Sequence, residues 1–228
     1  DNVESRGLGD VYKRQSADTT QVILPLFHTN AQSYSMLSTL WSGGTMVVQP
    51  RFSASRFWDV ALRNSVTWVS TIPFCVKAIL AGEIPQDHHF RFWGCAVRMP
   101  EVEQRIGVTT FGWWGMTETI TQGIVGDPDE PCAPYTIGRA SPAYEINVRR
   151  PDGSHIGPGE SGELFVRGIR GVSLFKEYAG NPEATSDSFD DDGWFATGDS
   201  IIMNDAGDLI FGDRLKDMLK VGAELSLI

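Results

Sequence analysis

The residues with the clearest chemical potential are Thr117 and Glu118, which directly follow the stretch Gly112-Trp113-Trp114-Gly115-Met116. A hydroxyl beside a carboxylate can bind a phosphate oxygen and the Mg²⁺ ion that accompanies it. Trp114 adds a flat face on which a purine could stack. The same pair also fits the start of a helix, where Thr caps the backbone and Glu complements the helix dipole. This segment alone is compatible with both interpretations.

A second polar cluster is expected around Asp199, which follows Thr197-Gly198 and is interpreted as lying in a tight turn. A carboxylate there suits two hydrogen bonds from ribose hydroxyls, and Arg214 could reach the same ribose or a phosphate. The alternative is structural: Asp199 caps a turn, and Arg214 pairs with Asp217 at the surface.

Alternating elements are expected to position the first cluster. The pattern predicts strands at 21–24, 45–48, 66–71, 90–95 and 108–113, and helices at 30–41, from Ser53 to 64, 74–81 and 100–106. Short connections between strands and helices favour a mostly parallel sheet covered by helices. Thr117 and Glu118 then lie at its carboxyl edge, where open α/β sheets bind ligands. The helix over 30–41 is expected to bury one face made by Ala31, Tyr34, Leu37 and Trp41.

The pattern changes after about residue 126 and becomes β-rich. Strands are expected at 144–150 and 163–168, and a hairpin at 199–203 and 208–212. The predicted fold class is therefore an α/β part followed by a β-rich, barrel-like part.

Composition excludes several classes of protein. The chain has 29 acidic and 19 basic residues, a net charge of −10 and a pI near 4.8, which argues against nucleic-acid or anionic-membrane binding. Its three cysteines lack zinc-ligand spacing and suit a reducing, cytoplasmic environment. No apolar run approaches the roughly 18 residues of a membrane span, and no secretory signal is visible.

Several motifs occur in an order that resembles the acyl- and aryl-adenylate-forming superfamily, from Val22 to Glu224. They are LPLFHTNAQ, the GCA turn at 94–96, WWGMTETI, GELFVRG with LFKEY and NPEAT, DGWFATGD, and GDRLKDMLKVGAE. Within the superfamily, the segments around HTNAQSYSMLSTLW, GMTETITQGIVGD and IRGVSLFKEY are most similar to the carnitine/crotonobetaine-CoA ligase group.

The resemblance implies an acyl-CoA ligase. In this family a carboxylate attacks the α-phosphate of ATP to give acyl-adenylate and pyrophosphate, and the thiol of coenzyme A then displaces AMP. The implied cofactors are ATP/AMP, Mg²⁺ and coenzyme A, and the implied partners are a small carboxylic acid and coenzyme A, with no nucleic acid. A homodimer is compatible with the resemblance.

The resemblance also implies a role for each matched residue. Thr117 contacts the α-phosphate, Glu118 holds Mg²⁺, and His28 lines the acyl and pantetheine channel. Within the nucleotide-binding segment Gly112–Thr117, Trp114 replaces the usual Tyr that stacks on adenine. The turn made by Gly94, Cys95 and Ala96 approaches the adenine as well. Asp199 and Arg214 hold the ribose. Lys216 is the hinge of a C-terminal lid, and Lys220, Gly222 and Glu224 approach the thiol. Cys95 and Ala223 stand where glycine is commoner.

Two family elements have no match in the chain: the Ser/Thr/Gly-rich phosphate loop with its lysine, and the lid lysine. We therefore expect an internal fragment of a longer protein that is inactive or slow by itself. The expected organisation is 1–19 unmatched, disordered or non-native, 20–126 α/β, 127–213 β-rich, and 214–228 the hinge and truncated start of the lid. Residues 225–228 are expected to be foreign as well.

Two alternatives stay open. One is a peptide-synthetase-type adenylation domain, although no Asp for an amino group is identifiable. The other is a non-catalytic nucleotide-binding module that kept the fold. The sequence does not identify the acid. The walls of its pocket are expected to come from the helix after His28, from Gly112-Trp113 and from residues 120–125. The bulky Trp113 side chain indicates a short or medium acid.

Overall fold

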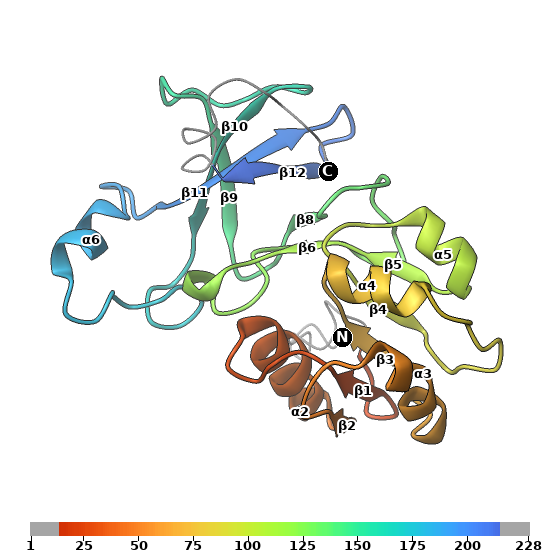
Figure 1. Cartoon of the computed structure of the whole chain (residues 1–228). Helices are drawn as coiled ribbons and strands as arrows, with labels where there is room; N and C mark the ends of the chain where they lie inside the picture. Colours follow the sequence, from red (N-terminus) through yellow and green to blue (C-terminus); the bar gives the residue numbers. More distant parts are fainter. Residues whose placement is uncertain (1–13, 215–228) are drawn as a thin grey trace, which may run out of the picture. The chain divides into compact units, whose positions relative to one another are not determined.

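The computed structural model describes residues 14–214, and the chain divides into two compact units, Asp1–Gly138 and Arg139–Ile228 (Figure 1). Each unit is described by itself. The first unit ends at Gly138, whereas the change to a β-rich sequence pattern placed the boundary at about residue 126. The first unit is a helix-covered parallel sheet and the second is antiparallel, which confirms the predicted fold class.

The first unit contains a five-stranded sheet in the order β2-β1-β3-β4-β5, in which every neighbouring pair is parallel. Its strands are β1 (Thr19–Val22), β2 (Thr45–Val48), β3 (Trp68–Ser70), β4 (Phe92–Gly94) and β5 (Thr109–Phe111). Its helices are η1 (Asn30–Leu37), α2 (Ser38–Ser42), α3 (Ala54–Arg63), α4 (Pro73–Leu80) and α5 (Pro100–Ile106). The predicted alternation of strands and helices is confirmed. The first strand lies two residues earlier than predicted, and β3, β4 and β5 are shorter.

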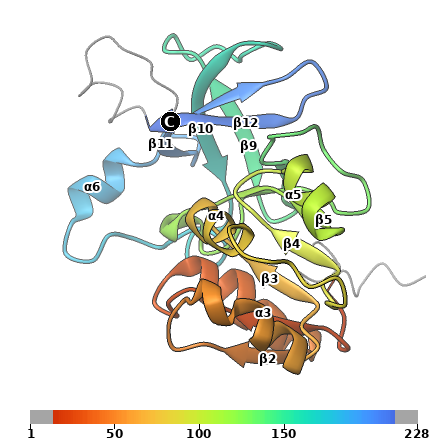
Figure 2. The same cartoon turned by 45° about the vertical axis from the view of Figure 1, so that its right-hand side comes forward.

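Two apolar layers pack on the two faces of this sheet. One face carries α3, α4 and α5, which contribute buried residues such as Phe57, Val76 and Val102, and Figure 2 shows these helices on one side of the strands. The other cluster joins Tyr34 of η1 to Trp68 of β3. Since neighbouring residues of a strand point to opposite faces, Trp68 and Val69 belong to different clusters.

The helix predicted over 30–41 differs from expectation. Its first eight residues form a π-helix, η1, in which each turn takes about one residue more than in an α-helix. Ala31 and Tyr34 are buried, but Leu37 is 50% and Trp41 is 73% exposed, so the single buried face is wrong. The wider turn moves residues spaced for an α-helix off one line. Gly43, at φ +73°, ends the helix as expected.

Two local predictions are also corrected. Ser53 precedes α3, but its side chain makes no capping hydrogen bond and its hydroxyl lies 3.3 Å from that of Ser55. The strand predicted at 108–113 is interrupted at Gly112, after which β6 (Trp113–Trp114) pairs antiparallel with β7 (Ile124–Val125). Between β6 and β7 lies η2 (Thr117–Thr119), a single 3₁₀ turn.

The second unit contains a four-stranded antiparallel sheet in the order β12-β11-β10-β9. Its strands are β9 (Glu145–Arg149), β10 (Ser161–Arg167), β11 (Phe195–Met203) and β12 (Leu209–Arg214), and the unit also contains β8 (Arg139–Ala140) and α6 (Pro182–Asp187). Leu164, Val166 and Ile201 are fully buried in this unit. Among the described helices, none is long and apolar enough to cross a membrane.

Candidate functional site

Three of the predicted site segments lie at one edge of the parallel sheet. His28 lies in the loop after β1, Gly94–Ala96 follows β4, and Gly112–Glu118 follows β5. Because parallel strands share their carboxyl edge, all three segments leave the sheet on the same side (Figure 1). The order in which strands are added to the sheet also reverses here: from β1 the chain moves to β2 on one side, whereas from β3 it moves to β4 on the other side. Such a switch point is where open α/β sheets bind ligands.

The Gly94–Ala96 turn is held by Thr71, the residue directly after β3. The backbone N–H of Thr71 donates to the Gly94 carbonyl at 2.8 Å, and the Thr71 hydroxyl donates to the same oxygen at 2.9 Å. The Cys95 N–H donates to the Phe111 carbonyl at 2.9 Å, which joins the turn to β5. Burial raises the pKa of the Cys95 thiol to about 12, against the lowering effect of the Thr71 hydroxyl. Cys95 is therefore a neutral packing residue at neutral pH, not a nucleophile.

Gly94 itself faces the indole of Trp113. A Cβ at position 94 would lie 1.9 Å from Trp113 Cη2, so only glycine leaves room for that ring. Trp113 is buried and packs at 5.4 Å from Tyr34 and 5.5 Å from Phe111, measured between ring centroids. In this structure the absent side chain of Gly94 makes space for protein packing.

The Trp114–Glu118 segment is shaped by one glycine, Gly115, and by Thr119, which follows it. A Cβ at Gly115 would lie 2.2 Å from the Tyr34 hydroxyl oxygen, so the two residues are packed against each other. Thr119 is fully buried, and its hydroxyl accepts from the Met116 N–H (3.0 Å) and shares its single proton between the carbonyls of Thr121 (2.7 Å) and Met116 (3.0 Å). Thr119 thereby closes the turn that carries Thr117 and Glu118.

Within that turn, Thr117 is exposed, Glu118 is half-buried, and Trp114 is buried. Ile120 follows at φ +60°, a left-handed conformation that is strained for a β-branched residue. The alternative interpretation of this segment was a helix start capped by Thr117. A helix does start here, but it is a single 3₁₀ turn, and Met116 and not Thr117 occupies its cap position. The Thr117 side chain is thus exposed beside a carboxylate that is half-buried.

His28 is exposed and lies two residues before the start of η1 at Asn30. Its N–H donates to the Pro25 carbonyl and its carbonyl accepts from the Gln32 N–H, each at 2.9 Å. Asn30, two residues later, accepts a hydrogen bond through Oδ1 from the Ser70 hydroxyl. The backbone at His28 is therefore fixed, while the imidazole faces outward.

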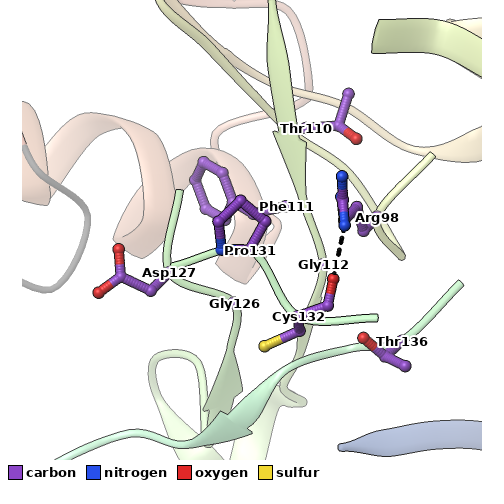
Figure 3. Close-up of a pocket in the computed structure, with 9 residues that line it drawn as sticks. All are labelled: Arg98, Thr110, Phe111, Gly112, Gly126, Asp127, Pro131, Cys132 and Thr136. Carbon is purple, nitrogen blue, oxygen red and sulfur yellow. Dashed lines mark hydrogen bonds between the residues drawn. The ribbon is translucent and has the colours of Figure 1, made fainter. Parts of the chain in front are cut away.

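The crevice beside Gly112 is closed (Figure 3). It is lined by Arg98, Thr110, Phe111, Gly112, Gly126, Asp127, Pro131, Cys132 and Thr136, and it has no room for a water molecule. Arg98 donates to the Cys132 carbonyl at 2.8 Å and to Glu103 at 3.2 Å. Burial alone raises the pKa of Glu103, but hydrogen bonds from Arg98 and Thr110 outweigh it and hold that pKa below its ordinary value. The cluster is a structural tie.

In the second unit, Asp199 and Arg214 are Cα partners across the β11–β12 ladder. Asp199 is 3% exposed and lies within β11, so the predicted tight turn is wrong. The strand instead contains an irregularity at this point, where Gly198 has φ +73° and its N–H donates to Glu163 at 3.2 Å. The Asp199 N–H donates to the Thr197 hydroxyl at 3.1 Å.

Other predicted site residues are not described or not joined. Lys216, Lys220, Gly222 and Glu224 lie outside the described residues. Asp199 belongs to one unit and Trp114–Glu118 to the other, so their convergence stays a prediction. The described part contains no group of three His, Cys, Asp or Glu side chains that could hold a metal ion. A single carboxylate at Glu118 nevertheless fits Mg²⁺, which is commonly held by one or two carboxylates together with substrate phosphates.

Sequence reasoning missed Ser70, Thr71 and Thr119 as parts of this edge. In the sequence, Ser70 and Thr71 lie at the end of a predicted strand, and Thr119 carries no predicted role. A signal was present, because consecutive hydroxyl residues at the end of a fully buried strand require hydrogen-bond partners.

Comparison with known proteins gives the class. The model of the AMP-binding enzyme family matches residues 2–179. The chain therefore belongs to the AMP-binding enzyme family. The match begins within the segment 1–19, which was expected to be foreign to the fold.

Individual relatives are more specific. The chain is 33% identical over 216 residues to crotonobetaine/carnitine–CoA ligases from Salmonella heidelberg and Salmonella typhimurium, covering 91% of this chain and 42% of each relative. Among solved structures, an ATP-bound RpMatB-BxBclM chimera superposes with a TM-score of 0.84 and 26% identity, over 92% of this chain and 42% of that one. O-succinylbenzoate coenzyme A synthetase from Bacillus subtilis, in complex with ATP and magnesium, gives 0.76 and 28%, over 88% of this chain and 42% of that one. The chain thus spans less than half the length of these relatives.

Proposed function

We propose that the chain contributes the adenylate-binding edge of an AMP-forming acyl-CoA ligase. The observation that supports this most directly is the shared carboxyl edge, at which His28, Gly94–Ala96 and Trp114–Glu118 leave the sheet around its switch point. Family membership and the ligase names of the relatives point to the same reaction class.

The reaction proposed has two steps. A substrate carboxylate attacks the α-phosphorus of ATP, the bond to the β-phosphate oxygen breaks, and pyrophosphate leaves. The sulfur of coenzyme A then attacks the acyl carbon, and AMP leaves. In both steps the protein acts mainly by positioning groups and stabilising developing charge.

Each residue at the edge has a proposed part in this reaction. The Thr117 hydroxyl donates to an α-phosphate oxygen, and its exposure leaves it free to reach one. Glu118 would hold Mg²⁺, which neutralises phosphate charge when bound. His28 orients the carboxylate, and Trp114 contacts the adenine.

In the second unit, Asp199 would accept hydrogen bonds from both ribose hydroxyls. Its low exposure supports a strong, charge-assisted contact because little water competes there. Arg214, its partner on the adjacent strand, would bind the ribose or a phosphate.

The acid is proposed to be short or medium in length. Trp113 and Tyr34 pack against each other and against Gly94 and Gly115, which fills the space between η1 and β6 with aromatic side chains. A long acyl chain would need that space.

Residues 1–228 as a separate polypeptide are proposed to bind nucleotide but to turn over slowly. The sequence contains no Ser/Thr/Gly-rich phosphate loop, and loss of one preorganised charge donor costs about 10²–10³ in rate. Robust acyl-hydroxamate formation by this chain in the presence of hydroxylamine, ATP and an acid would contradict this part of the proposal.

Calorimetric titration with AMP tests the site itself. Asp199→Ala should weaken AMP binding about tenfold, as expected for loss of a buried charge-assisted contact. Unchanged affinity would favour a non-catalytic module. ATP–pyrophosphate exchange driven by amino acids, and not by other carboxylic acids, would favour a peptide-synthetase-type domain.

A further inference from the structure

Two buried hydroxyl residues stand in succession at the carboxyl end of β3: Ser70, its last residue, and Thr71, which follows it. Each is about 1% exposed. A buried hydroxyl is costly unless it is hydrogen-bonded, and each of these two side chains bonds to a different loop. β3 lies between β1 and β4 in the sheet, so it has a loop of the candidate site on either side.

Ser70 bonds to the loop after β1. Its hydroxyl donates to Oδ1 of Asn30, the first residue of η1. Asn30 lies two residues beyond His28, whose own backbone is held by Pro25 and Gln32. The Ser70 contact therefore fixes the start of η1 on the sheet, and with it the point from which the exposed His28 ring projects.

Thr71 bonds to the turn after β4. Its N–H and its hydroxyl both donate to the Gly94 carbonyl, at 2.8 and 2.9 Å. Its hydroxyl also lies 3.4 Å from the sulfur of Cys95. Two donors on one carbonyl fix the orientation of the peptide that begins the Gly94–Ala96 turn.

The division between the two loops follows from strand geometry. Successive side chains of a strand point to opposite faces, so Ser70 shares the η1 face with Trp68, whereas Thr71 does not. One residue of displacement along β3 would exchange the two contacts. The register with β4, in which Ser70 is the Cα partner of Gly94, excludes that exchange.

We propose that Ser70 and Thr71 are positioning residues that set the two halves of the acyl-adenylate site independently. Ser70 positions the acyl side through Asn30 and His28, and Thr71 positions the adenosine side through Gly94–Ala96. This inference rests on the proposed function, because it assigns the two loops to the two parts of an acyl-adenylate.

The test compares two probes on the 228-residue chain: AMP, and 5′-O-(N-butanoylsulfamoyl)adenosine, a stable mimic of an acyl-adenylate. Thr71→Val removes the hydroxyl at nearly constant volume and should weaken both probes equally, by roughly five- to tenfold for one lost hydrogen bond. Ser70→Ala should weaken only the acyl-adenylate mimic, by roughly the same factor. Thr71→Ser restores the hydroxyl and should restore both affinities to within about twofold.

A matched control lies at the other end of the same strand. The Thr67 hydroxyl, just before β3, donates to Asp18 at 2.8 Å at the amino edge of the sheet. Thr67→Val should lower the melting temperature as Thr71→Val does, with no change in the affinity for either probe. Asn30→Ala should change the two affinities as Ser70→Ala does. The Ser70→Ala/Asn30→Ala double variant should bind the mimic no more weakly than either single variant, because both substitutions remove the same hydrogen bond.

The outcomes separate this inference from the proposed function. If the unmodified chain binds neither probe, the proposed function is wrong for this chain, and the inference falls with it. If it binds AMP but Ser70→Ala weakens AMP as much as the acyl-adenylate mimic, the Ser70 half of the inference is overturned. If Thr71→Val changes the two affinities no more than Thr67→Val does, the Thr71 half is overturned and that hydroxyl is purely structural. Equal affinity of the unmodified chain for the two probes would overturn the Ser70 half, because His28 would then make no contact with the acyl group.

Discussion

The two edges of the parallel sheet are built from different chemistry. At the amino edge, the Asp18 carboxylate is 4% exposed and accepts from Arg91 at 2.6 Å, from the Thr67 hydroxyl at 2.8 Å and from the Gln15 N–H at 2.7 Å. At the carboxyl edge, the loops are held by the neutral hydroxyls of Ser70 and Thr71 and by the absence of a side chain at Gly94.

The difference suits a division in which the amino edge contributes stability and the carboxyl edge holds the proposed binding site. At the amino edge Arg91 and Asp18 bind each other, and the Asp18 carboxylate is withdrawn from solvent. The carboxyl edge is tied by uncharged hydrogen bonds, so Thr117 stays exposed and Glu118 only half-buried. Substitutions at the amino edge should therefore change stability alone, and those at the carboxyl edge should change both stability and ligand affinity.

The largest effect is expected from Gly94→Ala. Its Cβ would lie 1.9 Å from the buried Trp113 ring, so the ring or the backbone must move. We expect the free energy of unfolding to fall by about 3 kcal/mol and AMP binding to be lost, as measured by urea denaturation and calorimetry. Gly82→Ala is the control, because its Cβ would be 3.8 Å from the nearest atom, and it should change stability by less than about 0.5 kcal/mol.

The next effect is expected at the amino edge, from Asp18→Asn. Breaking a buried ion pair costs about 3–5 kcal/mol, but Arg91 keeps 33% of its side-chain exposure and can be solvated, so we expect about 2 kcal/mol. The affinity for AMP should stay the same. Weaker AMP binding in a folded Asp18→Asn variant would show that the two edges are coupled, and would break the comparison.

A smaller loss of stability is expected from Thr119→Val. The substitution keeps the shape of the side chain but removes the hydroxyl that bonds to Met116 and Thr121. We expect about 1–2 kcal/mol in the free energy of unfolding and about tenfold weaker AMP binding, because the turn that carries Thr117 and Glu118 loosens. Thr119→Ser should recover most of both quantities, and a variant that loses stability with full AMP affinity would contradict the role given to this turn.

The smallest effect concerns acid stability near the carboxyl edge. The pKa of Glu103 is lower in the folded protein than its ordinary value, so its contribution to stability is complete above about pH 4.5 and is lost as pH falls through the lower, folded pKa. Glu103→Gln should therefore flatten the fall of the urea midpoint below about pH 4.5. An unchanged acid dependence would show that other carboxylates account for it.

Much of the fold was predictable because it depends on local pattern. Pro100–Ile106 forms a helix at the predicted residues, since Pro at its first position and Gly107 after its end are both local signals. Thr45–Val48 forms the predicted strand for the same kind of reason. The exposures of Leu37 and Trp41 were not predictable, because a π-helix at Asn30–Leu37 is not encoded by the spacing of apolar residues.

The segments of the candidate site were predictable from the sequence, but the hydrogen bonds that hold these segments in place were not. Trp114–Glu118 was singled out by residue type and Gly94–Ala96 by the family resemblance, and the order of strands brings the two segments to one edge. The prediction of a tight turn at Asp199 was wrong because Gly198, at positive φ, lies in an irregular part of β11. The sequence Thr-Gly-Asp does not distinguish such an irregularity from a turn.

By itself the sequence determined which elements form and in which order the polar segments follow them, because strand and helix periodicity are properties of neighbouring residues. Only the tertiary structure decided that Gly94 makes room for Trp113, that Tyr34 faces Gly115, and that Ser70 and Thr71 bond to different loops. These contacts join residues 19 to 81 positions apart, and their geometry depends on how strands pair and which face each side chain takes.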